Sequence, residues 1–206
     1  MTEFEKMVSG RLYDPNLDGS CSKVANKSRR LCQIYNAIPV EDEKKRQEVL
    51  KELLPHAGEG LYIQGPLQFD YGVNTYFGKN CYVNFNFVVL DCAPVRIGND
   101  VFFGPNCQLL TPIHPYLAEE RKMRINKAGN LSEIEYGKPI EIGDGCWFGA
   151  GVTVLPGVKI GKNTIVGAGS VVNRDLPEGV IAAGNPCRVI RPVAKEDSIT
   201  LKDFLY

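Results

Sequence analysis

The stretch from Ile142 to Leu176 repeats a pattern of six residues, and no other feature of the sequence restricts the fold as strongly. In successive hexads it reads IGDGCW, FGAGVT, VLPGVK, IGKNTI, VGAGSV and VNRDLP. An aliphatic or aromatic residue opens every hexad: Ile142, Phe148, Val154, Ile160, Val166 and Val172. The fifth place is small or apolar: Cys146, Val152, Val158, Thr164, Ser170 and Leu176. A period of six fits neither an amphipathic helix, which repeats every 3.6 residues, nor a single strand, which repeats every two.

This period does fit short strands separated by turns, three to a coil, which stack into a parallel β-helix. The residue that opens each hexad would point into the coil, and the glycine that often follows it permits a tight corner. A chance alternation of β-branched residues and turns is the alternative, and six successive hexads make it a poor explanation. The same spacing occurs earlier in two sets: Phe77, Val83 and Val89, then Ile97, Phe103 and Leu109. We therefore predict a mostly β protein built on a β-helix over residues 61–193.

Residues 1–60 form a separate segment with helical patterns. Thr2 and Glu5 have the spacing of a capping box ahead of a short helix. A second helical pattern ends at Pro39, and a third begins at about Asp42. Helices this short are marginally stable alone, so we expect this segment to pack on an end or a flank of the β-helix.

The hexad pattern is interrupted between residues 114 and 139 by a polar, charged stretch, HPYLAEERKMRINKAGNLSEIEYGKP. Long segments without a pattern inside a compact domain are usually functional loops or linkers. Because regular coils resume at Ile140, we predict a loop extruded from the β-helix. A polar tail over residues 194–206 completes the predicted organisation.

The composition excludes several classes of protein. Lysine and arginine together number 24, as do aspartate and glutamate, so the chain lacks the basic surface of a nucleic-acid-binding protein. No apolar run is long enough to span a bilayer, and the polar start MTEFEKMVSG does not resemble a signal peptide, which favours a cytoplasmic location. The seven cysteines include no CxxC pair, so we expect no metal site and read most cysteines as reduced packing residues.

Several motifs together resemble the maltose and galactoside O-acetyltransferases, a family of hexapeptide-repeat acyltransferases. They are the YDP turn, FDYG at 69–72, NCYVNFNFVVLD at 80–91, the histidine that opens the loop, and AAGNPCRVIR at 182–191. The resemblance covers nearly the whole chain, including the helical segment. It implies a left-handed coil, acetyl-coenzyme A as the acetyl donor, and a homotrimer with active sites between subunits. The left hand comes from the resemblance alone, since the general rule for β-crossover connections predicts the right.

His114 is the candidate general base. Acetyl transfer from a thioester to a sugar hydroxyl needs a group that takes the hydroxyl proton, and an imidazole titrates in the suitable range. The chain has only one other histidine, His56, next to Pro55 at the end of a charged helix, where a surface role is expected. His114 lies between two prolines where a coil gives way to the loop, which favours a position in a cleft. An ordinary loop histidine is the alternative.

The resemblance also implies roles for other residues. The backbone amide at Ala150 would stabilise the oxyanion formed on the thioester carbonyl. The acceptor sugar would be bound by a set of polar and aromatic residues: Asp14, Asp70, Tyr82, Asn84 and Asp91. Tyr82 is equally suited to packing, and Asp14 to an Asx turn. The galactoside enzymes have an acidic residue where this chain has Cys92 and a serine at Asp70, so the identity of the sugar stays open.

Residues that would border acetyl-coenzyme A also follow from the resemblance: Trp147, Ala150, Ala168, Asn173, Arg188 and Arg191. The guanidinium group of arginine suits the phosphates of the adenosine end, and a solvated tail is the alternative for both arginines. Trp147 is the only tryptophan and could equally lie at a subunit interface. Two other hypotheses stay open: the same chemistry on a non-sugar acceptor such as an antibiotic or serine, and a β-helix scaffold without catalytic activity.

Overall fold

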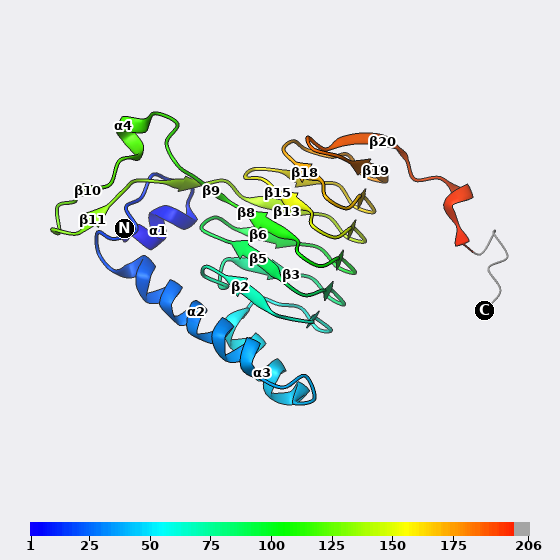
Figure 1. The fold of residues 1–206 in the computed structure, drawn as a ribbon, viewed down its shortest axis with the longest axis horizontal. Coiled ribbons are helices and arrows are strands. Elements are labelled where there is room, and N and C mark those ends of the chain that lie inside the picture. Colours follow the sequence, from blue (N-terminus) through cyan, green and yellow to red (C-terminus); the bar gives the residue numbers. More distant parts are fainter. Residues whose placement is uncertain (200–206) are drawn as a thin grey trace.

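The computed structural model describes residues 1–199, and most of this chain winds into a three-sided parallel β-helix (Figure 1). Each side is one sheet. The seven-stranded sheet contains, in spatial order, β1 (Tyr62–Ile63), β4 (Tyr82–Val83), β7 (Phe102–Phe103), β14 (Trp147–Phe148), β17 (Ile165–Val166), β19 (Val180–Ala183) and β20 (Arg188–Pro192). The five-stranded sheet contains β18 (Val171–Val172), β15 (Thr153–Val154), β8 (Gln108–Leu110), β5 (Phe87–Leu90) and β2 (Leu67–Phe69). The four-stranded sheet contains β16 (Lys159–Ile160), β13 (Ile140–Ile142), β6 (Val95–Ile97) and β3 (Thr75–Phe77).

The residues that open the hexads stack in register inside the coil, as the six-residue period predicted. Ile97 pairs with Ile142, which pairs with Ile160, and all of them are buried. On the seven-stranded sheet, Phe103 and Phe148 stack with ring centroids 4.7 Å apart. Fully burying a side chain of this size contributes about 1.5–3 kcal/mol, so the repeated rows form the main stabilising element of the fold.

The corners bring successive coils so close together that some of them require glycine. A Cβ atom added to Gly98 would lie 2.6 Å from the backbone nitrogen of Asp144 on the next coil. Gly78 stands in the same relation to Gly98, with the carbonyl carbon of Gly98 only 2.5 Å from a Cβ atom at Gly78. At these two positions, the short distance between coils restricts the second place of the hexad to glycine.

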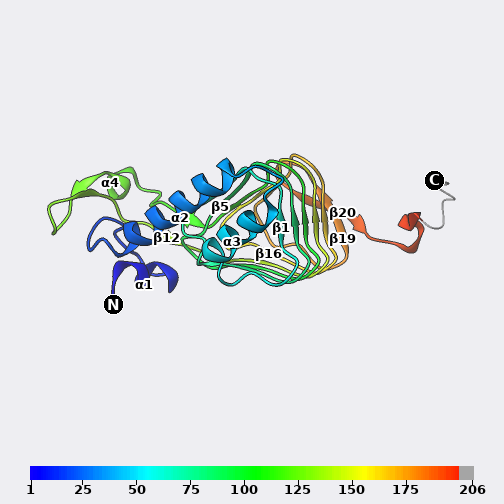
Figure 2. The same ribbon diagram turned by 90° about the horizontal axis from the view of Figure 1, so that it is seen from below.

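Three helices precede the first coil: α1 (Glu3–Val8), α2 (Ser20–Ala37) and α3 (Glu43–Leu53). Their bounds agree with the sequence patterns, and Thr2 and Glu5 form the predicted capping box. Figures 1 and 2 show α2 and α3 lying across the end of the prism at which β1 and β2 begin. Arg46 of α3 donates to the carbonyl oxygens of Ile63 and Gln64 at 3.2 and 2.5 Å. Helix α3 therefore satisfies two backbone carbonyls at the end of the edge strand β1.

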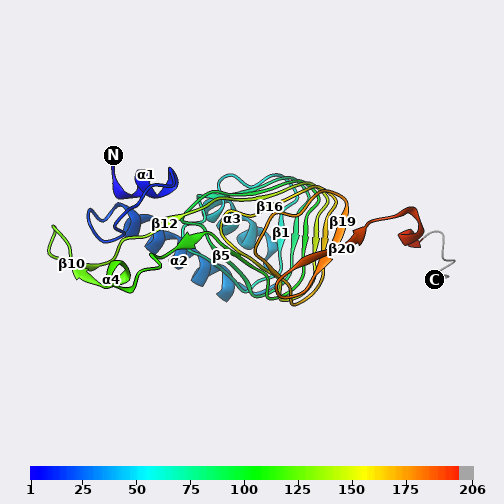
Figure 3. The ribbon, with the colours of Figure 1, turned by 90° about the horizontal axis from the view of Figure 1, so that it is seen from above.

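The segment between residues 114 and 139 leaves the coil as predicted, but it is not without structure. It contains a short helix and three short strands: α4 (Ala118–Arg121), β10 (Arg124–Ile125), β11 (Leu131–Ser132) and β12 (Tyr136–Gly137). β10 pairs with β11, and β12 pairs in antiparallel fashion with β9 (Pro112–Ile113). Figures 1 and 3 show this loop projecting from the β-helix on the side where α1 lies. These strands pair in antiparallel fashion, so the chain of the loop folds back on itself. The six-residue period describes only parallel coils and therefore could not predict these strands.

The C-terminal end of the coil is closed by a hairpin. β19 continues the seven-stranded sheet in parallel, and β20 adds to it in antiparallel fashion. A short 3₁₀ helix, η1 (Lys195–Asp197), follows, and the rest of the predicted tail beyond residue 199 lies outside the described residues. None of the helices described here has the length and apolar character needed to cross a membrane.

All seven cysteines are buried and free. The Sγ atoms of Cys81, Cys107 and Cys146 lie near backbone carbonyls on neighbouring coils, which confirms their reading as reduced packing residues.

Candidate active site

His114 lies at the mouth of the extruded loop, directly after β9. The antiparallel register pairs Ile113 with Tyr136, which places Glu135 opposite His114. The Nδ1 atom of His114 is 3.6 Å from Oε2 of Glu133 and 3.6 Å from Oε2 of Glu135. The imidazole is 47% exposed, so it combines access from solvent with two carboxylates on one side.

Glu135 is held in place by the N-terminal segment. Its Oε1 accepts a hydrogen bond of 2.6 Å from the hydroxyl of Tyr13, and the backbones of the two residues form an antiparallel bridge. Burial raises the pKa of Glu135, while the hydrogen bond from Tyr13 and the nearby His114 lower it. Our sequence interpretation missed Glu133, Glu135 and Tyr13. The signal for two of them was the sequence SEIEYG, in which Glu133 and Glu135 alternate as residues on one face of a strand do.

These side chains also form a set that could hold a cation. One ligand atom each from His114, Glu133 and Glu135 lies within 4.8 Å of the others, and no other such set of three or more is found within residues 1–199. The mixture of imidazole nitrogen and carboxylate oxygen suits a transition metal ion better than Mg²⁺ or Ca²⁺. The cysteine spacing, which was the basis for expecting no metal site, carries no information on this set.

Asp14 lies close to the same part of the loop. Its carboxylate accepts hydrogen bonds from the Ser132 hydroxyl and, at 3.0 Å, from Nδ2 of Asn126. It also accepts from the backbone N–H of Asn16 at 2.9 Å, which is the Asx turn considered as its alternative role. Asp14 and Glu133 line the same shallow pocket, so this candidate acceptor-binding residue shares a pocket with one of the two carboxylates that face His114.

Asp70 is half-buried at the end of β2 and lies 3.7 Å from the guanidinium of Arg29. Burial raises the pKa of Asp70, and the charge of Asp70 in turn raises the pKa of Glu135. Asp70 therefore belongs to the same electrostatic environment as the carboxylates that face His114.

The prediction for Asp91 is wrong, because its carboxylate has no exposed surface. Oδ1 accepts from the backbone N–H of Tyr71 at 2.8 Å, and Oδ2 accepts from the hydroxyl of Thr75 at 2.9 Å. Burial raises the pKa of Asp91 to about 6. Asp91 thus fixes the turns between neighbouring coils, and it has no atom available to an acceptor.

Tyr82 and Asn84 lie on another side of the prism. The Tyr82 ring stacks on Tyr62 at 5.9 Å and lies 6.1 Å from Phe102, so it is partly packed, as its alternative role required. Oδ1 of Asn84 accepts from the backbone N–H of Phe85 at 2.8 Å, which leaves the amide nitrogen to donate. Over the described part of the chain, no hydrogen bond or ring contact joins Tyr82 or Asn84 to His114.

Ala150 and Ala168 are exposed and occupy equivalent corners of adjacent coils. The N–H of Gly169 donates to the carbonyl of Ala150 at 2.8 Å, which ties the two corners together. The amides on either side of Ala150, those of Gly149 and Gly151, both donate to backbone carbonyls. The N–H of Ala150 itself has no backbone acceptor among residues 1–199, so it is free to donate to a bound group.

The other predicted cofactor residues lie toward the C-terminal end of the coil. Arg188 donates to the amide oxygen of Asn173 at 3.3 Å, so these two residues are brought together. Arg191 is engaged differently, since both terminal nitrogens of its guanidinium donate to Asp197 at 2.6 and 2.7 Å. Trp147 is 55% exposed on the outer face of the seven-stranded sheet, between Phe102 and Ile165.

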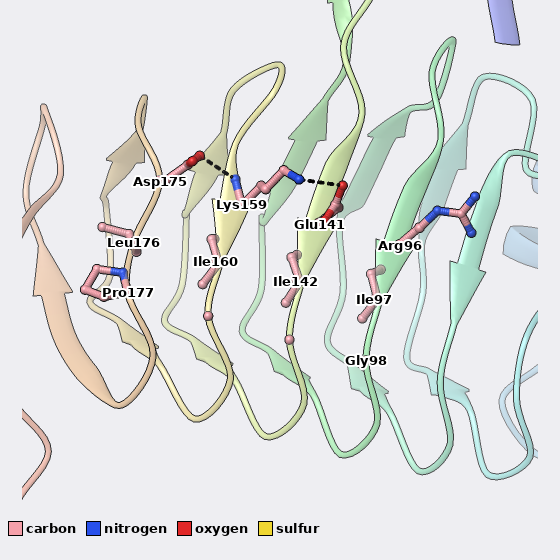
Figure 4. A pocket seen from close by; sticks show the side chains of 12 residues that line it. Arg96, Ile97, Gly98, Glu141, Ile142, Lys159, Ile160, Asp175, Leu176 and Pro177 are labelled. Atoms are coloured by element: carbon pink, nitrogen blue, oxygen red, sulfur yellow. Dashed lines mark hydrogen bonds and ion pairs between the residues drawn. The ribbon is translucent and has the colours of Figure 1, made fainter. Parts of the chain in front are cut away.

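A wide trough follows a different corner of the prism and contains none of the predicted site residues (Figure 4). Its polar side chains alternate in charge along the four-stranded sheet, and Nζ of Lys159 lies 3.1 Å from Oε1 of Glu141. The backbone N–H of Lys159 also donates to Asp175 at 2.8 Å. Because Lys159 and Glu141 pair with each other and Asp175 is engaged by the backbone, we assign the chemistry to the region around His114.

A β-helix of hexapeptide rungs with a half-exposed histidine at the mouth of a loop is the architecture of a hexapeptide-repeat acyltransferase. The known families whose models match the chain are consistent with this class. "Bacterial transferase hexapeptide (six repeats)" matches residues 139–174, and "Hexapeptide repeat of succinyl-transferase" matches residues 94–114. "Maltose acetyltransferase hexapeptide capping motif" matches residues 6–58, which are the N-terminal helices.

Individual relatives show to which family of hexapeptide-repeat acyltransferases the chain belongs. Galactoside O-acetyltransferase of Escherichia coli is 37% identical over 94% of this chain and 90% of its own length. The crystal structure of a maltose O-acetyltransferase from Clostridium difficile superposes with a TM-score of 0.86 at 37% identity, covering 95% of this chain and 99% of the other. A galactoside acetyltransferase in complex with coenzyme A also gives 0.86, at 35% identity, covering 96% and 94%. The chain belongs to the maltose and galactoside O-acetyltransferase family and is an acetyltransferase.

Proposed function

We propose that this protein transfers the acetyl group of acetyl-coenzyme A to a hydroxyl group of a sugar, with His114 as general base. The observation that carries the proposal is the position of His114, half-exposed at the loop mouth with Nδ1 facing Glu133 and Glu135. A carboxylate that accepts the Nδ1 proton leaves the lone pair of Nε2 free to take a proton from an acceptor. Apo structures often show such catalytic hydrogen bonds longer than they are in the complex with substrate.

The reaction then needs no covalent enzyme intermediate. Nε2 of His114 takes the hydroxyl proton while the acceptor oxygen attacks the thioester carbonyl, which forms a tetrahedral oxyanion. The free N–H of Ala150 is suited to donate to this oxyanion. Collapse of the intermediate breaks the carbon–sulfur bond, and the thiolate of coenzyme A receives the proton from His114.

Binding of the donor is assigned to the edge of the coil that carries Ala150 and Ala168. The relative solved with coenzyme A supports this donor, since it shares the fold over nearly the whole chain. The corners present free backbone donors to the amides of the pantetheine arm, and Arg188, with Asn173 beside it, would bind the phosphates of the adenosine end. The ion pair between Arg191 and Asp197 has to break before Arg191 can bind a phosphate.

We further propose a homotrimer in which one active site draws on two subunits. Within one chain, Tyr82, Asn84 and Trp147 lie on a side of the prism that makes no contact with His114 among the described residues. Exposed apolar side chains on this side, at Phe102 and Trp147, are those that association would cover. A neighbouring subunit would bring its own face with Tyr82 and Asn84 toward His114.

The acceptor is assigned as a sugar because the carboxylates near His114 are suited to polyhydroxylated substrates. Asp14 and Asp70 offer acceptor oxygens, and Nδ2 of Asn84 offers a donor. Measuring release of free thiol from acetyl-coenzyme A tests the assignment, with maltose, glucose, a thiogalactoside, serine and an aminoglycoside as separate acceptors. We expect release with sugars, and release only with serine or the antibiotic would contradict the sugar assignment. No release with any acceptor would contradict the donor and the reaction together.

A further inference from the structure

Tyr13 is buried at the point where the N-terminal segment meets the loop, with 2% of its surface exposed. Its hydroxyl donates to Oε1 of Glu135 at 2.6 Å. Burial raises the pKa of Tyr13 far above its ordinary value, so the phenol stays protonated and acts only as a donor to this carboxylate. The other oxygen of Glu135, Oε2, is the one that faces Nδ1 of His114.

We propose that Tyr13 is a positioning residue, which fixes the carboxylate of Glu135 so that Oε2 holds the proton of neutral His114 on Nδ1. The inference rests on the proposed function of His114 as general base. A neutral imidazole has one N–H and one free lone pair, and the partner of one nitrogen decides which nitrogen carries the proton. Only the tautomer with the proton on Nδ1 leaves Nε2 able to accept a proton from the acceptor hydroxyl.

The geometry distinguishes Glu135 from Glu133, although both lie at the same distance from Nδ1. Glu135 is fixed by the Tyr13 hydroxyl and by the backbone bridge between these two residues, and its side chain is 14% exposed. Glu133 is 26% exposed and has no ion pair with lysine or arginine in the described part of the chain. Tyr13 therefore selects Glu135 as the partner that orients the imidazole.

Tyr13 also supports the charge on Glu135. Burial, the neighbouring carboxylate of Glu133 and the more distant Asp70 all raise the pKa of Glu135, while Tyr13 and His114 lower it. Two further groups face Tyr13 in this cluster, Tyr71 and Cys92, and burial raises the pKa of both, so that neither supplies a negative charge at neutral pH. Without the phenol, Oε1 of the ionised carboxylate would lose its only hydrogen-bond donor among the described residues.

The imidazole spectrum gives a direct test, because the chain has only two histidines. In ¹H–¹⁵N correlation spectra of the neutral form of His114, we expect the wild-type imidazole to carry its proton on Nδ1. In Tyr13→Phe the proton should move in large part to Nε2, while the spectrum of His56 stays unchanged. Tyr76→Phe is the matched control, since the Tyr76 ring stacks on His56 and lies outside the site. An unchanged tautomer of His114 in Tyr13→Phe would overturn the inference.

Kinetics supply the second readout. We expect Tyr13→Phe to lower kcat about tenfold with an unchanged KM for acetyl-coenzyme A, because the imidazole is misoriented while the donor site is intact. In a Glu135→Gln background, Tyr13→Phe should have little further effect, since both changes remove the same orientation. Additive losses would assign Tyr13 a purely structural role and overturn the inference. Absence of transfer by the wild-type protein would instead contradict the proposed function, and the tautomer measurement would still decide the role of Tyr13.

Discussion

The carboxylate of Asp91 accepts a hydrogen bond of 2.8 Å from the backbone N–H of Tyr71, in a part of the core from which solvent is excluded. The same carboxylate accepts from Thr75, and the backbone carbonyl of Asp91 accepts from the side chain of Asn74 at 2.8 Å. One residue thus connects two successive coils directly after β5. Such a buried group affects stability in a pH-dependent way, because its charged form is costly in the folded state.

We predict that Asp91→Asn changes the pH dependence of stability. Burial raises the pKa of Asp91 from 3.8 to about 6, so the folded protein holds this proton more tightly than the unfolded chain. The contribution of Asp91 to the free energy of unfolding should therefore fall as pH rises from about 4 to about 6, and stay low above that range. A shift of this size corresponds to about 3 kcal/mol.

Urea unfolding of both proteins at several pH values measures this effect. Asparagine retains an acceptor for Tyr71, so Asp91→Asn should fold, and its stability relative to the wild type should rise between pH 4 and pH 6. Asp91→Ala is the contrasting variant, since it leaves the Tyr71 amide without its acceptor and should be destabilised at every pH by about 1–3 kcal/mol. A constant difference between Asp91→Asn and wild type across this range would refute the assignment of the raised pKa.

His114→Ala should lower kcat by about 10²–10⁴-fold, the usual contribution of a general base. The affinity for coenzyme A should stay unchanged, because His114 lies outside the corners at Ala150 and Ala168 to which we assign the donor. His56→Ala is the control, since this histidine stacks on Tyr76 away from the loop. Calorimetric binding of coenzyme A and the rate of thiol release separate the two effects. Equal activity of His114→Ala and His56→Ala would exclude His114 as the base.

Gly98→Ala should destabilise the coil by about 1–3 kcal/mol, because a Cβ atom would overlap with the backbone of Asp144 on the next coil. Gly129→Ala is the matched control. It lies in the extruded loop at a φ of +82°, with no atom within 4 Å of an added Cβ atom, so it reports backbone strain without overlap. Thermal unfolding of both variants compares the two costs. If Gly98→Ala were no less stable than Gly129→Ala, the contact between coils would not be what restricts this position.

The sequence period predicted what depends on local repetition. Rows such as Ile97, Ile142 and Ile160 follow directly from the hexads, because parallel coils place every equivalent residue in the same row. The contact that holds Glu135 beside His114 did not follow, since Tyr13 and Glu135 are 122 positions apart and meet only through the antiparallel return of the loop. No period describes such a pairing.

The error at Asp91 has a different cause. Along β5 the buried residues Phe87 and Val89 alternate with less buried neighbours, and Asp91 continues this alternation as an inward residue. The family pattern placed a carboxylate near the acceptor, while in the folded chain Asp91 turns into the core and Cys92 is buried beside it. The inward orientation of Asp91 therefore follows from the alternation along β5, which the family pattern did not take into account.

The two C-terminal arginines should differ in their effect on the donor. Arg188 is exposed, and its one described side-chain partner is the neutral amide of Asn173, so its charge is available to a phosphate. Arg191 already pairs with Asp197, and phosphate binding there has to compete with this pair. Arg188→Ala should raise the KM for acetyl-coenzyme A about tenfold, and Arg191→Ala should raise it less. Arg30→Ala on the exposed surface of α2 is the control.

Repeating the measurement with acetyl-pantetheine, which lacks the adenosine phosphates, isolates the interaction between Arg188 and the phosphates, because Arg188→Ala should then have no effect. A loss of equal size with both donors would show that Arg188 acts on the shape of the coil end and not on phosphate.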